Sequence, residues 1–287
     1  MRLTNYIFAL LLVLISSVSV FGGGGWPQKK GEAYIKLSEW FIIASEHYTS
    51  QGQIDPNQTA GLYNTTLYAE YGVTDRFTVV VNFPFFSRGV LNNIISSTNG
   101  ATIVEGDAIN GVGDIDFTLK YGIFQSEKIA ISASFVAGLA IGQSAGGRDA
   151  NIQLGDGEYN QMLRLDFGIP FNVSNASLYA NLYGAYNNRT NGFSDEIRFG
   201  GEIGAGLVKD KLWLVAKADA VQSTFNGDRA EATASIFANN AEFFMFTAEV
   251  SYEFTENFGI SFAFGTPLSG RIVYAAPSYS FGFYSKF

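Results

Sequence analysis

Tyr279-Ser-Phe-Gly-Phe-Tyr-Ser-Lys-Phe287, the last stretch of the chain, decides the fold. Apolar aromatic residues alternate with small or polar ones, so a strand made from this stretch has one apolar face and one polar face. Such a strand suits a wall that meets hydrocarbon on one side and a polar interior on the other. The stretch therefore predicts a strand of a transmembrane β-barrel.

The same period of two recurs along the chain. It is clearest in residues 113–124, where Ile115, Phe117, Leu119, Tyr121 and Ile123 share one face opposite polar and charged residues. We predict an all-β, antiparallel, up-and-down transmembrane barrel of twelve strands, give or take two. The predicted strands are residues 31–47, 60–73, 76–87, 113–124, 128–142, 159–171, 177–187, 195–208, 211–222, 241–255, 258–266 and 273–287.

The predicted connections alternate in length. Short polar turns fall at residues 73–76, 125–128, 171–176, 208–211 and 255–258. Longer connections rich in Gly, Asn and Ser fall at residues 48–59, 88–112, 143–158, 188–194, 223–240 and 267–272. Barrels of bacterial outer membranes have this asymmetry, with short periplasmic turns and longer external loops. An even number of strands then places both termini on the periplasmic side.

Composition agrees with a barrel and argues against several classes of partner. Charged residues make up only 15% of the 287 residues, against about 25% in a typical soluble domain. The mean hydropathy of +0.11 is too low for a bundle of membrane helices. The net charge of −8 argues against nucleic acid as a partner. There is no cysteine, so disulfides and thiolate chemistry are excluded.

The chain divides into a leader and one domain. Residues 1–22 begin with the positive charge of Arg2, continue with an apolar run at 6–15 and end in small residues, which predicts a secretory signal peptide. The alternative, a membrane anchor helix, needs about 20 apolar residues, and this run is shorter. Residues 23–287 are then one barrel, exported to the outer membrane of a Gram-negative bacterium with its signal peptide cleaved.

A soluble β-sandwich gives the same alternation, because its charged face meets water and its apolar face forms the core. Three features favour the membrane: the leader, strands of about 11–15 residues where about 5–6 is usual, and the terminal Phe287. A charge on the lipid face at mid-membrane costs about 2–4 kcal/mol, which explains why the outer faces of the nine clearest predicted strands carry none. Hydrocarbon is therefore expected to touch Ile115, Phe135, Phe199 and Phe246.

The opposite faces collect the charges, and these are the candidate lumen residues. They are Glu70, Asp114, Asp116, Lys120, Arg164, Asp166, Glu196, Arg198, Glu202, Lys217, Asp219, Glu249 and Glu253. Acids and bases that face each other across a lumen can pair, so a narrow, partly filled and mildly acidic interior is expected. Either these charges only brace the barrel, or they make it prefer cations. Trp213 and Tyr183 offer a lining for a small hydrophobic or aromatic solute.

Catalytic and metal-binding patterns are weak, so no enzyme activity and no cofactor is expected. The single histidine, His47, is expected at a loop edge, and its neighbours Ser45 and Glu46 cannot all share its face of a strand. Asp149 and Asp156-Gly-Glu158 lie in a Gly-rich loop, but their spacing is not that of a known calcium loop, and no metal site is expected. The Gly-rich run at 200–206 lies within a strand and is not a phosphate-binding turn.

One segment resembles a known family. Asn110-Gly-Val-Gly-Asp-Ile-Asp-Phe-Thr-Leu-Lys-Tyr121 is similar to the Gly-x-Gly-Asp and Lys-Tyr pattern of bacterial outer-membrane barrels named "putative MetA-pathway of phenol degradation". Val79-Val-Val-Asn-Phe-Pro-Phe85, after the turn Gly72-Val-Thr-Asp-Arg76, also resembles that family. The resemblance implies a barrel that takes up hydrophobic or aromatic compounds. The C-terminal strand further resembles the signal read by the barrel-assembly machinery, with Tyr279, Phe281, Phe283 and Phe287 in place and Ser285 departing from it.

Two functions remain open at this point. The first is a passive, porin-like channel or transporter for small, hydrophobic or aromatic molecules, with outer-membrane lipid around it and an unnamed solute inside. The second is a scaffold or surface-recognition protein that acts through the loops at 88–112, 143–158 and 223–240.

Overall fold

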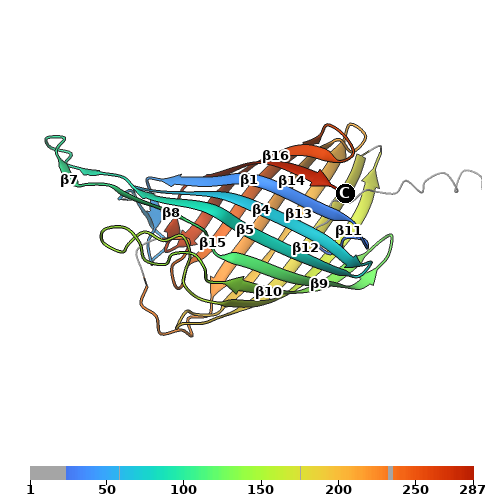
Figure 1. Cartoon of the computed structure of the whole chain (residues 1–287), viewed down its shortest axis with the longest axis horizontal. Helices are drawn as coiled ribbons and strands as arrows, with labels where there is room; N and C mark the ends of the chain where they lie inside the picture. The colour runs from blue at the N-terminus through green and yellow to red at the C-terminus, as the bar shows by residue number, and fades with distance from the viewer. Residues whose placement is uncertain (1–23, 58, 175, 232–234) are drawn as a thin grey trace, which may run out of the picture.

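The computed structural model describes residues 24–57, 59–174, 176–231 and 235–287, and the predicted signal peptide lies outside them. The wall is built from long strands (Figure 1). They are β1 (Ala33–Ala44), β4 (Ala60–Thr74), β5 (Phe77–Leu91), β9 (Ile115–Gln125), β10 (Ala130–Leu139), β11 (Asn160–Val173), β12 (Ala176–Arg189), β13 (Glu196–Leu207), β14 (Leu212–Ser223), β15 (Glu242–Glu253), β16 (Phe258–Arg271) and β18 (Ser278–Lys286).

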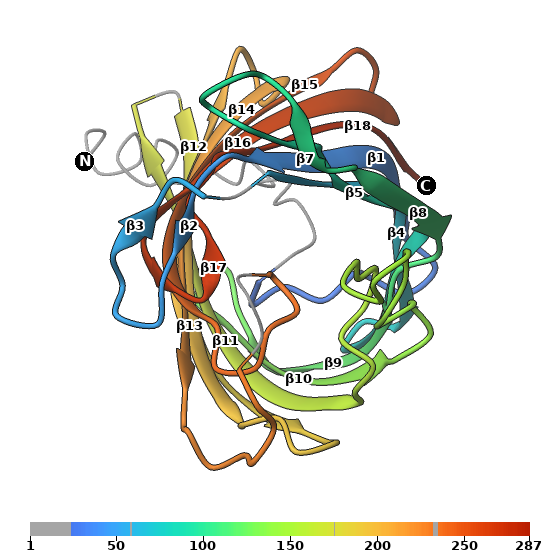
Figure 2. The same ribbon diagram turned by 90° about the vertical axis from the view of Figure 1, so that its left-hand side faces the viewer.

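These strands form one closed antiparallel ring of twelve, as predicted (Figure 2). Consecutive wall strands pair all the way round, and β18 closes the ring by pairing with β1 from Tyr34↔Lys286 to Ile42↔Ser278. The backbones of Ala33 and Phe287 donate one hydrogen bond to each other, at 3.0 and 2.9 Å. A closed ring leaves no unpaired strand edge in the wall, which is what a membrane requires of a β protein.

Side chains alternate across the wall as the period of two predicts. Phe135, Phe199 and Phe246 are 41%, 47% and 38% exposed on the outer face. Their neighbours on the inner face are buried, for example Ser134 and Glu196. The apolar residues therefore do not form a core between two stacked sheets, and the sandwich alternative is excluded. In the part of the chain that the structure describes, no helix is long and apolar enough to cross a membrane.

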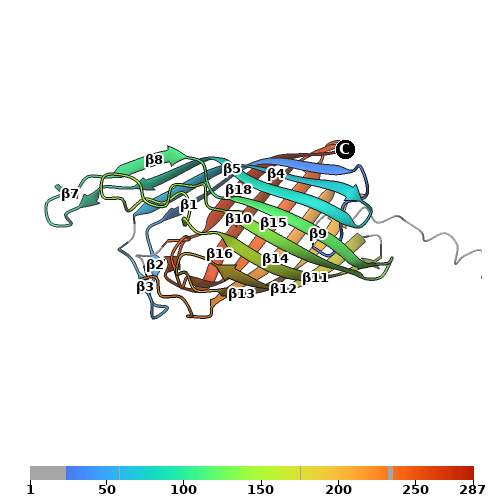
Figure 3. The ribbon, with the colours of Figure 1, turned by 60° about the horizontal axis from the view of Figure 1, so that its bottom comes forward.

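Several predicted boundaries at the external end are wrong, because the chain stays extended beyond the barrel. β5 continues to Leu91, so the predicted loop at 88–112 begins later and contains β8 (Asp107–Gly111), which pairs with β5. It also contains the hairpin of β6 (Ile94–Ile95) and β7 (Thr102–Val104), which projects past the ring (Figures 1 and 3).

The last predicted strand, residues 273–287, is likewise two elements. β16 runs to Arg271, through most of the predicted loop at 267–272, and β18 begins only at Ser278. Between them, β17 (Val273–Tyr274) pairs with β2 (His47–Tyr48), which in turn pairs with β3 (Ile54–Asp55). This small sheet lies at the external end of the barrel (Figure 2).

Candidate functional site: the barrel lumen

The inner wall carries a chain of ion pairs. Lys217 Nζ lies 2.8 Å from Glu249 and 3.7 Å from Glu202, and Lys36 Nζ reaches Glu249 at 3.5 Å. Lys36 lies on β1 and Glu249 on β15, so the lysine side chain crosses β18 and β16 along the wall. It passes over Gly282, where an added Cβ would lie 2.8 Å from Lys36 Cε.

Several other charged lumen candidates also have polar partners nearby. Arg164 donates two hydrogen bonds to Asp166, and Arg198 lies 2.5 Å from Glu196 in the same strand. Tyr183 donates to Asp219 at 2.7 Å, and Lys286 pairs with Glu253. Pairing therefore runs along the wall, between residues two apart or between strands at most three positions apart in the ring, and the expected pairing across the lumen is not what these contacts show. Asp116 and Lys120 lie on the inner face of β9, and Lys120 is buried.

The periplasmic end of the lumen contains residues 24–30, which we call the strap. They run from β12 across β10, β9 and β5 to β4 on the inner surface, and the blue start of the described chain crosses the ring in Figure 2. The Gly25 N–H donates to Asn181 Oδ1 at 2.9 Å, and Gln125 donates to the Gly25 carbonyl at 3.0 Å. The Gln28 N–H donates to Thr78 at 2.8 Å.

Glu70, one of the predicted lumen residues, holds the far end of the strap. It accepts a hydrogen bond from Gln28 Nε2 at 2.9 Å and another from the Tyr68 hydroxyl. Glu70 is 2% exposed, so these bonds satisfy a carboxylate that solvent does not reach. The sequence places Glu70 inside the barrel but gives no sign of its partner, because the strap lies more than forty residues upstream.

Glycines in the wall make room for the strap. An added Cβ at Gly72 would overlap the carbonyl oxygen of Lys29, and one at Gly168 would lie 2.5 Å from the Trp26 ring. At Gly122 it would lie 3.0 Å from Pro27. The close approach of one backbone to another requires residues without a side chain. The wall is therefore shaped to the strap along its length.

Trp26 of the strap also packs on lumen aromatic residues. Its ring meets Tyr179 edge to face at 5.9 Å, and Tyr179 lies 5.9 Å from Trp213. Trp213 is only 1% exposed and donates to the carbonyl of Asp210 at 2.9 Å. Trp213 is therefore part of a packed periplasmic cluster, and it is not the open lining for a solute that the sequence suggested.

The external mouth is narrowed by apolar packing inside the ring. Leu154, in the loop of residues 140–159, is 1% exposed and clusters with Ile42 of β1, Leu62 of β4 and Ala276. Phe237, in the loop of residues 224–241, packs against this cluster. Figure 2 shows the 140–159 loop within the outline of the ring, whereas the first part of the 224–241 loop runs outside it. Burying a side chain such as Leu154 contributes about 1.5–3 kcal/mol, so the loops have a reason to fold inward.

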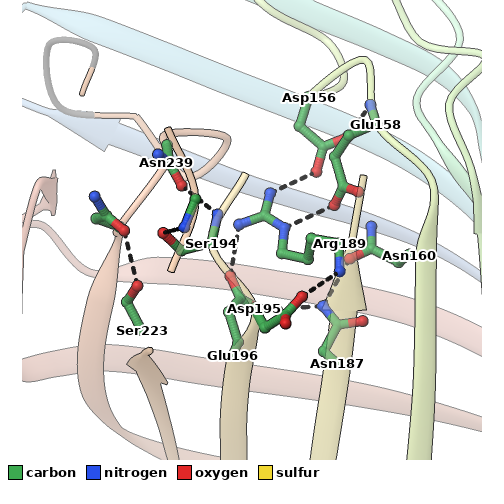
Figure 4. A network of polar contacts seen from close by, with 12 residues as sticks. Asp156, Glu158, Asn160, Asn187, Arg189, Ser194, Asp195, Glu196, Ser223 and Asn239 are labelled. Atoms are coloured by element: carbon green, nitrogen blue, oxygen red, sulfur yellow. Dashed lines mark hydrogen bonds and ion pairs between the residues drawn. The ribbon is translucent and has the colours of Figure 1, made fainter. Parts of the chain in front are cut away.

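A buried ionic network holds the 140–159 loop to the wall (Figure 4). Arg189, at the external end of β12, lies 3.1 Å from Asp156, 2.7 Å from Glu158 and 2.7 Å from Glu196. Glu158 also accepts a hydrogen bond from the Thr190 N–H at 2.9 Å. Desolvation offsets much of the attraction in such a network, so its main effect is to fix the position of the loop.

The 224–241 loop is fixed by amide side chains beside this network. Asn239 accepts from the Ser194 N–H at 2.9 Å and donates to the Arg229 carbonyl at 2.6 Å. Asp195 accepts from Asn226 Nδ2 at 2.8 Å, and Asn226 accepts from the Asp195 N–H at the same distance. These bonds hold the pKa of Asp195 below its usual value, although burial acts in the opposite direction.

Asp114, another predicted lumen residue, lies in the bend between β8 and β9 and ties that bend to the 140–159 loop. Its two carboxylate oxygens accept from the Gly142 N–H at 2.8 Å and from the Asp156 N–H at 2.9 Å. Burial raises the pKa of Asp114 to about 6, against the two hydrogen bonds, and the nearby Asp156 raises it further.

The residues considered for catalysis or metal binding lie elsewhere or are already engaged. His47 lies in β2, outside the ring, and pairs with Tyr274 and Asp55 in the small sheet. Asp156 and Glu158 bind Arg189, and within the described ranges no group of three or more His, Cys, Asp or Glu residues is placed to hold a metal ion. The Gly-rich run at 200–206 lies in β13.

Sequence reasoning missed the strap and the apolar mouth. One signal for the mouth is present: Trp40-Phe41-Ile42-Ile43 is apolar on both faces of β1, which predicts protein on the inner side as well as lipid on the outer side. The strap, with its Gly-rich start and polar end, has no periodicity that would place it in the lumen.

Comparison with known proteins finds the same type of fold among solved outer-membrane proteins. No family model and no curated protein matches the chain. The chain is similar to the COG4313 outer-membrane channel from Pseudomonas putida F1, with 16% identity, 93% of this chain and 100% of that chain covered, and a TM-score of 0.56. It is also similar to the KdgM porin in complex with disordered oligogalacturonate, with 10% identity, coverage of 88% and 99%, and a TM-score of 0.51. The chain thus shares its overall fold with these outer-membrane barrels.

Proposed function

We propose that the protein is a passive channel of a bacterial outer membrane for small molecules, including hydrophobic and aromatic ones. One observation carries this: a closed ring with an apolar outer face encloses a polar inner face that is partly filled at both ends by its own chain. The fold shared with an outer-membrane channel and a porin supports the proposal. The exposed Phe281 and Phe283 of β18, and Phe287 directly after it, support insertion through the barrel-assembly machinery into lipid.

The strap and the inward loops set what the channel is expected to pass. Both narrow the lumen, so the conductance of the intact protein is expected to be small. Two experiments test the proposal on the protein purified in detergent. The first reconstitutes it into a planar bilayer and measures single-channel conductance. The second measures the swelling of liposomes that contain it in solutions of small neutral and aromatic solutes. The proposal would be contradicted if the protein showed no conductance and no solute flux, both when intact and after removal of the strap.

A second function, surface recognition, has one observation in its favour. The β6–β7 hairpin projects beyond the barrel, and Ile94, Ile95 and Ile103 are 50%, 59% and 65% exposed on it. Exposed apolar side chains at the tip of a loop are a common feature of binding surfaces. Deletion of the hairpin that abolishes binding to a partner while leaving permeability unchanged would favour this function over the channel.

A further inference from the structure

A cavity of about 400 Å³ lies at the external mouth of the barrel. The external ends of β4 and β5 form one side of it, and the 140–159 and 224–241 loops form the others. Cavities of about 300–1,000 Å³ hold small ligands in proteins. The described parts of the loops that line it are tied to the wall by the Arg189 network and by Asn239, so the cavity is a formed site.

Apolar and polar groups share the wall of this mouth cavity almost equally. Its larger aliphatic and phenyl side chains are Leu62, Val90, Leu91, Ile152, Ile236 and Phe237. Leu62 and Ile152 are each only 4% exposed, so they are held in place by packing on the inner wall. Such a surface binds an apolar group of the size of one ring or a short aliphatic chain by excluding water from it.

Arg229 is the one charged residue among those described that line the cavity. Its backbone is fixed, because its N–H donates to the Gly192 carbonyl at 2.8 Å and its carbonyl accepts from Asn239. Its guanidinium lies 4.4 Å from the centre of the Phe193 ring. Within the described part of the chain, no carboxylate lies close enough to form an ion pair with it.

Arg189 gives the contrast. Its guanidinium lies 4.3 Å from the same Phe193 ring, but three carboxylates surround it and its side chain is only 5% exposed. Arg189 is therefore a structural cation, while Arg229 is exposed and keeps its hydrogen-bond donors for another group. A guanidinium binds a carboxylate with two parallel hydrogen bonds, which fixes both its position and its orientation.

We infer that the mouth cavity binds a small carboxylate with an apolar body, aromatic or aliphatic. The apolar body lies against Leu62, Ile152 and Phe237, and the carboxylate binds Arg229. The inference rests on the proposed channel function, since it names the class of solute that the mouth selects. The lumen cations Arg164 and Lys217 already have carboxylate partners and Lys120 is buried, so the exposed Arg229 at the mouth makes the selection for an anion.

Binding to the full chain in detergent tests this inference, with benzoate as the probe and benzyl alcohol as its uncharged counterpart. Calorimetric titration is expected to show tighter binding of benzoate. Arg229→Gln is expected to weaken benzoate binding about two- to fivefold, the range for an exposed ion pair, and to leave benzyl alcohol unchanged. Arg229→Lys is expected to retain most of the preference. Arg76→Gln removes an exposed cation at the opposite, periplasmic end and is the matched control, expected to change neither.

A second variant tests the cavity itself. Ala145 lines it from an exposed position in the 140–159 loop, so Ala145→Trp is expected to fill the volume and weaken both probes without altering the barrel. Equal affinity for the two probes, or a preference for benzoate that survives Arg229→Gln, would overturn the inference. Binding of benzoate that follows these expectations in a protein that passes no solute supports the site and contradicts only the channel.

Discussion

The two ends of the lumen are narrowed by different means. At the periplasmic end a single peptide, the strap, lies in a groove of glycines and is held by hydrogen bonds such as those of Gln28. At the external end two loops that belong to the wall fold inward around an apolar cluster and the buried network of Arg189. Within the described residues, the strap is covalently continuous with the wall only at its C-terminal end, where it leads into β1. Each loop is continuous with a wall strand at both of its ends.

This difference suggests different roles. Removing the strap leaves every strand pairing of the ring intact, because β1 begins only at Ala33. Removing the support of a loop exposes buried charges and apolar side chains, which costs free energy of folding. The strap is thus the part whose removal is expected to change permeability most, and the mouth is the part whose disruption is expected to change stability most.

The largest expected effect comes from deletion of residues 24–30. Because this peptide occupies the periplasmic lumen, its deletion is expected to raise single-channel conductance severalfold while the barrel still folds. Deletion of residues 96–101, at the tip of the β6–β7 hairpin outside the ring, is the control of similar length and is expected to leave conductance unchanged. Unchanged conductance after the strap deletion would contradict the role of the strap in limiting permeability at the periplasmic end.

The next effect is on stability, at the mouth. Arg189→Met leaves Glu158 buried without its cationic partner and Glu196 with Arg198 alone, which is expected to lower the free energy of unfolding by about 3–5 kcal/mol. Urea unfolding followed by the electrophoretic shift between folded and unfolded barrel measures this. Arg148→Met breaks an exposed pair with Glu105, 3.7 Å apart, and is expected to cost less than about 1 kcal/mol. Similar losses in both variants would contradict the role given to burial.

A single methyl group in the strap groove has a smaller expected effect than the deletion. Gly72→Ala places a Cβ where the Lys29 carbonyl lies, so it is expected to displace the strap and raise conductance part of the way towards the deletion. Gly184→Ala is the matched control, because an added Cβ there meets no atom within 4 Å. If both variants conduct like the parent protein, the groove does not hold the strap as described.

The smallest expected effect is a dependence of the mouth on pH through Asp114. Its pKa is about 6 in the folded protein, above the ordinary 3.8, so the folded state binds more protons between these values. Stability of the mouth is therefore expected to fall as pH rises from about 4 to about 6 and to level off above about 7. Because Asp114 is partly exposed, the change is expected to be only about 1 kcal/mol.

Limited proteolysis of the 140–159 loop as a function of pH measures this change. Asp114→Asn cannot titrate and is expected to remove the dependence over this window. A loop that becomes more resistant as the pH rises from 4 to 6 would show that the pKa of Asp114 is lowered and not raised.

The wall was predictable from the sequence because its pattern is local. Alternation in residues 113–124 places Phe117 outside and Lys120 inside with no knowledge of any other strand. The same holds for the short turns, which join neighbouring strands. The predicted lumen charges lie on the inner face for this reason, while their lateral pairing needed the strand register, which brings Lys217 between Glu202 and Glu249.

The two ends of the lumen were not predictable, because their contacts join residues far apart in the chain. Gly25 meets Asn181 across 156 positions, and Gln28 meets Thr78 across fifty. No periodicity in residues 24–30 marks such contacts. Leu154 and Phe237 lie in stretches rich in small and polar residues that read as loops, and only the packed structure shows that they enter the ring.

The position of the strap is the central claim, and the absence of cysteine from the chain allows a direct test of it. The Gln28 N–H lies 2.8 Å from Thr78 Oγ1, so the pair Gln28→Cys and Thr78→Cys is expected to form a disulfide that joins the strap to β5. The measurement is single-channel conductance of this variant before and after addition of a reductant, combined with Gly72→Ala to loosen the strap. We predict low conductance in the oxidised protein and, on reduction, a rise to the level of Gly72→Ala alone. Failure of the two cysteines to form a disulfide in the folded barrel, or equal conductance in both states, would contradict a strap in the lumen.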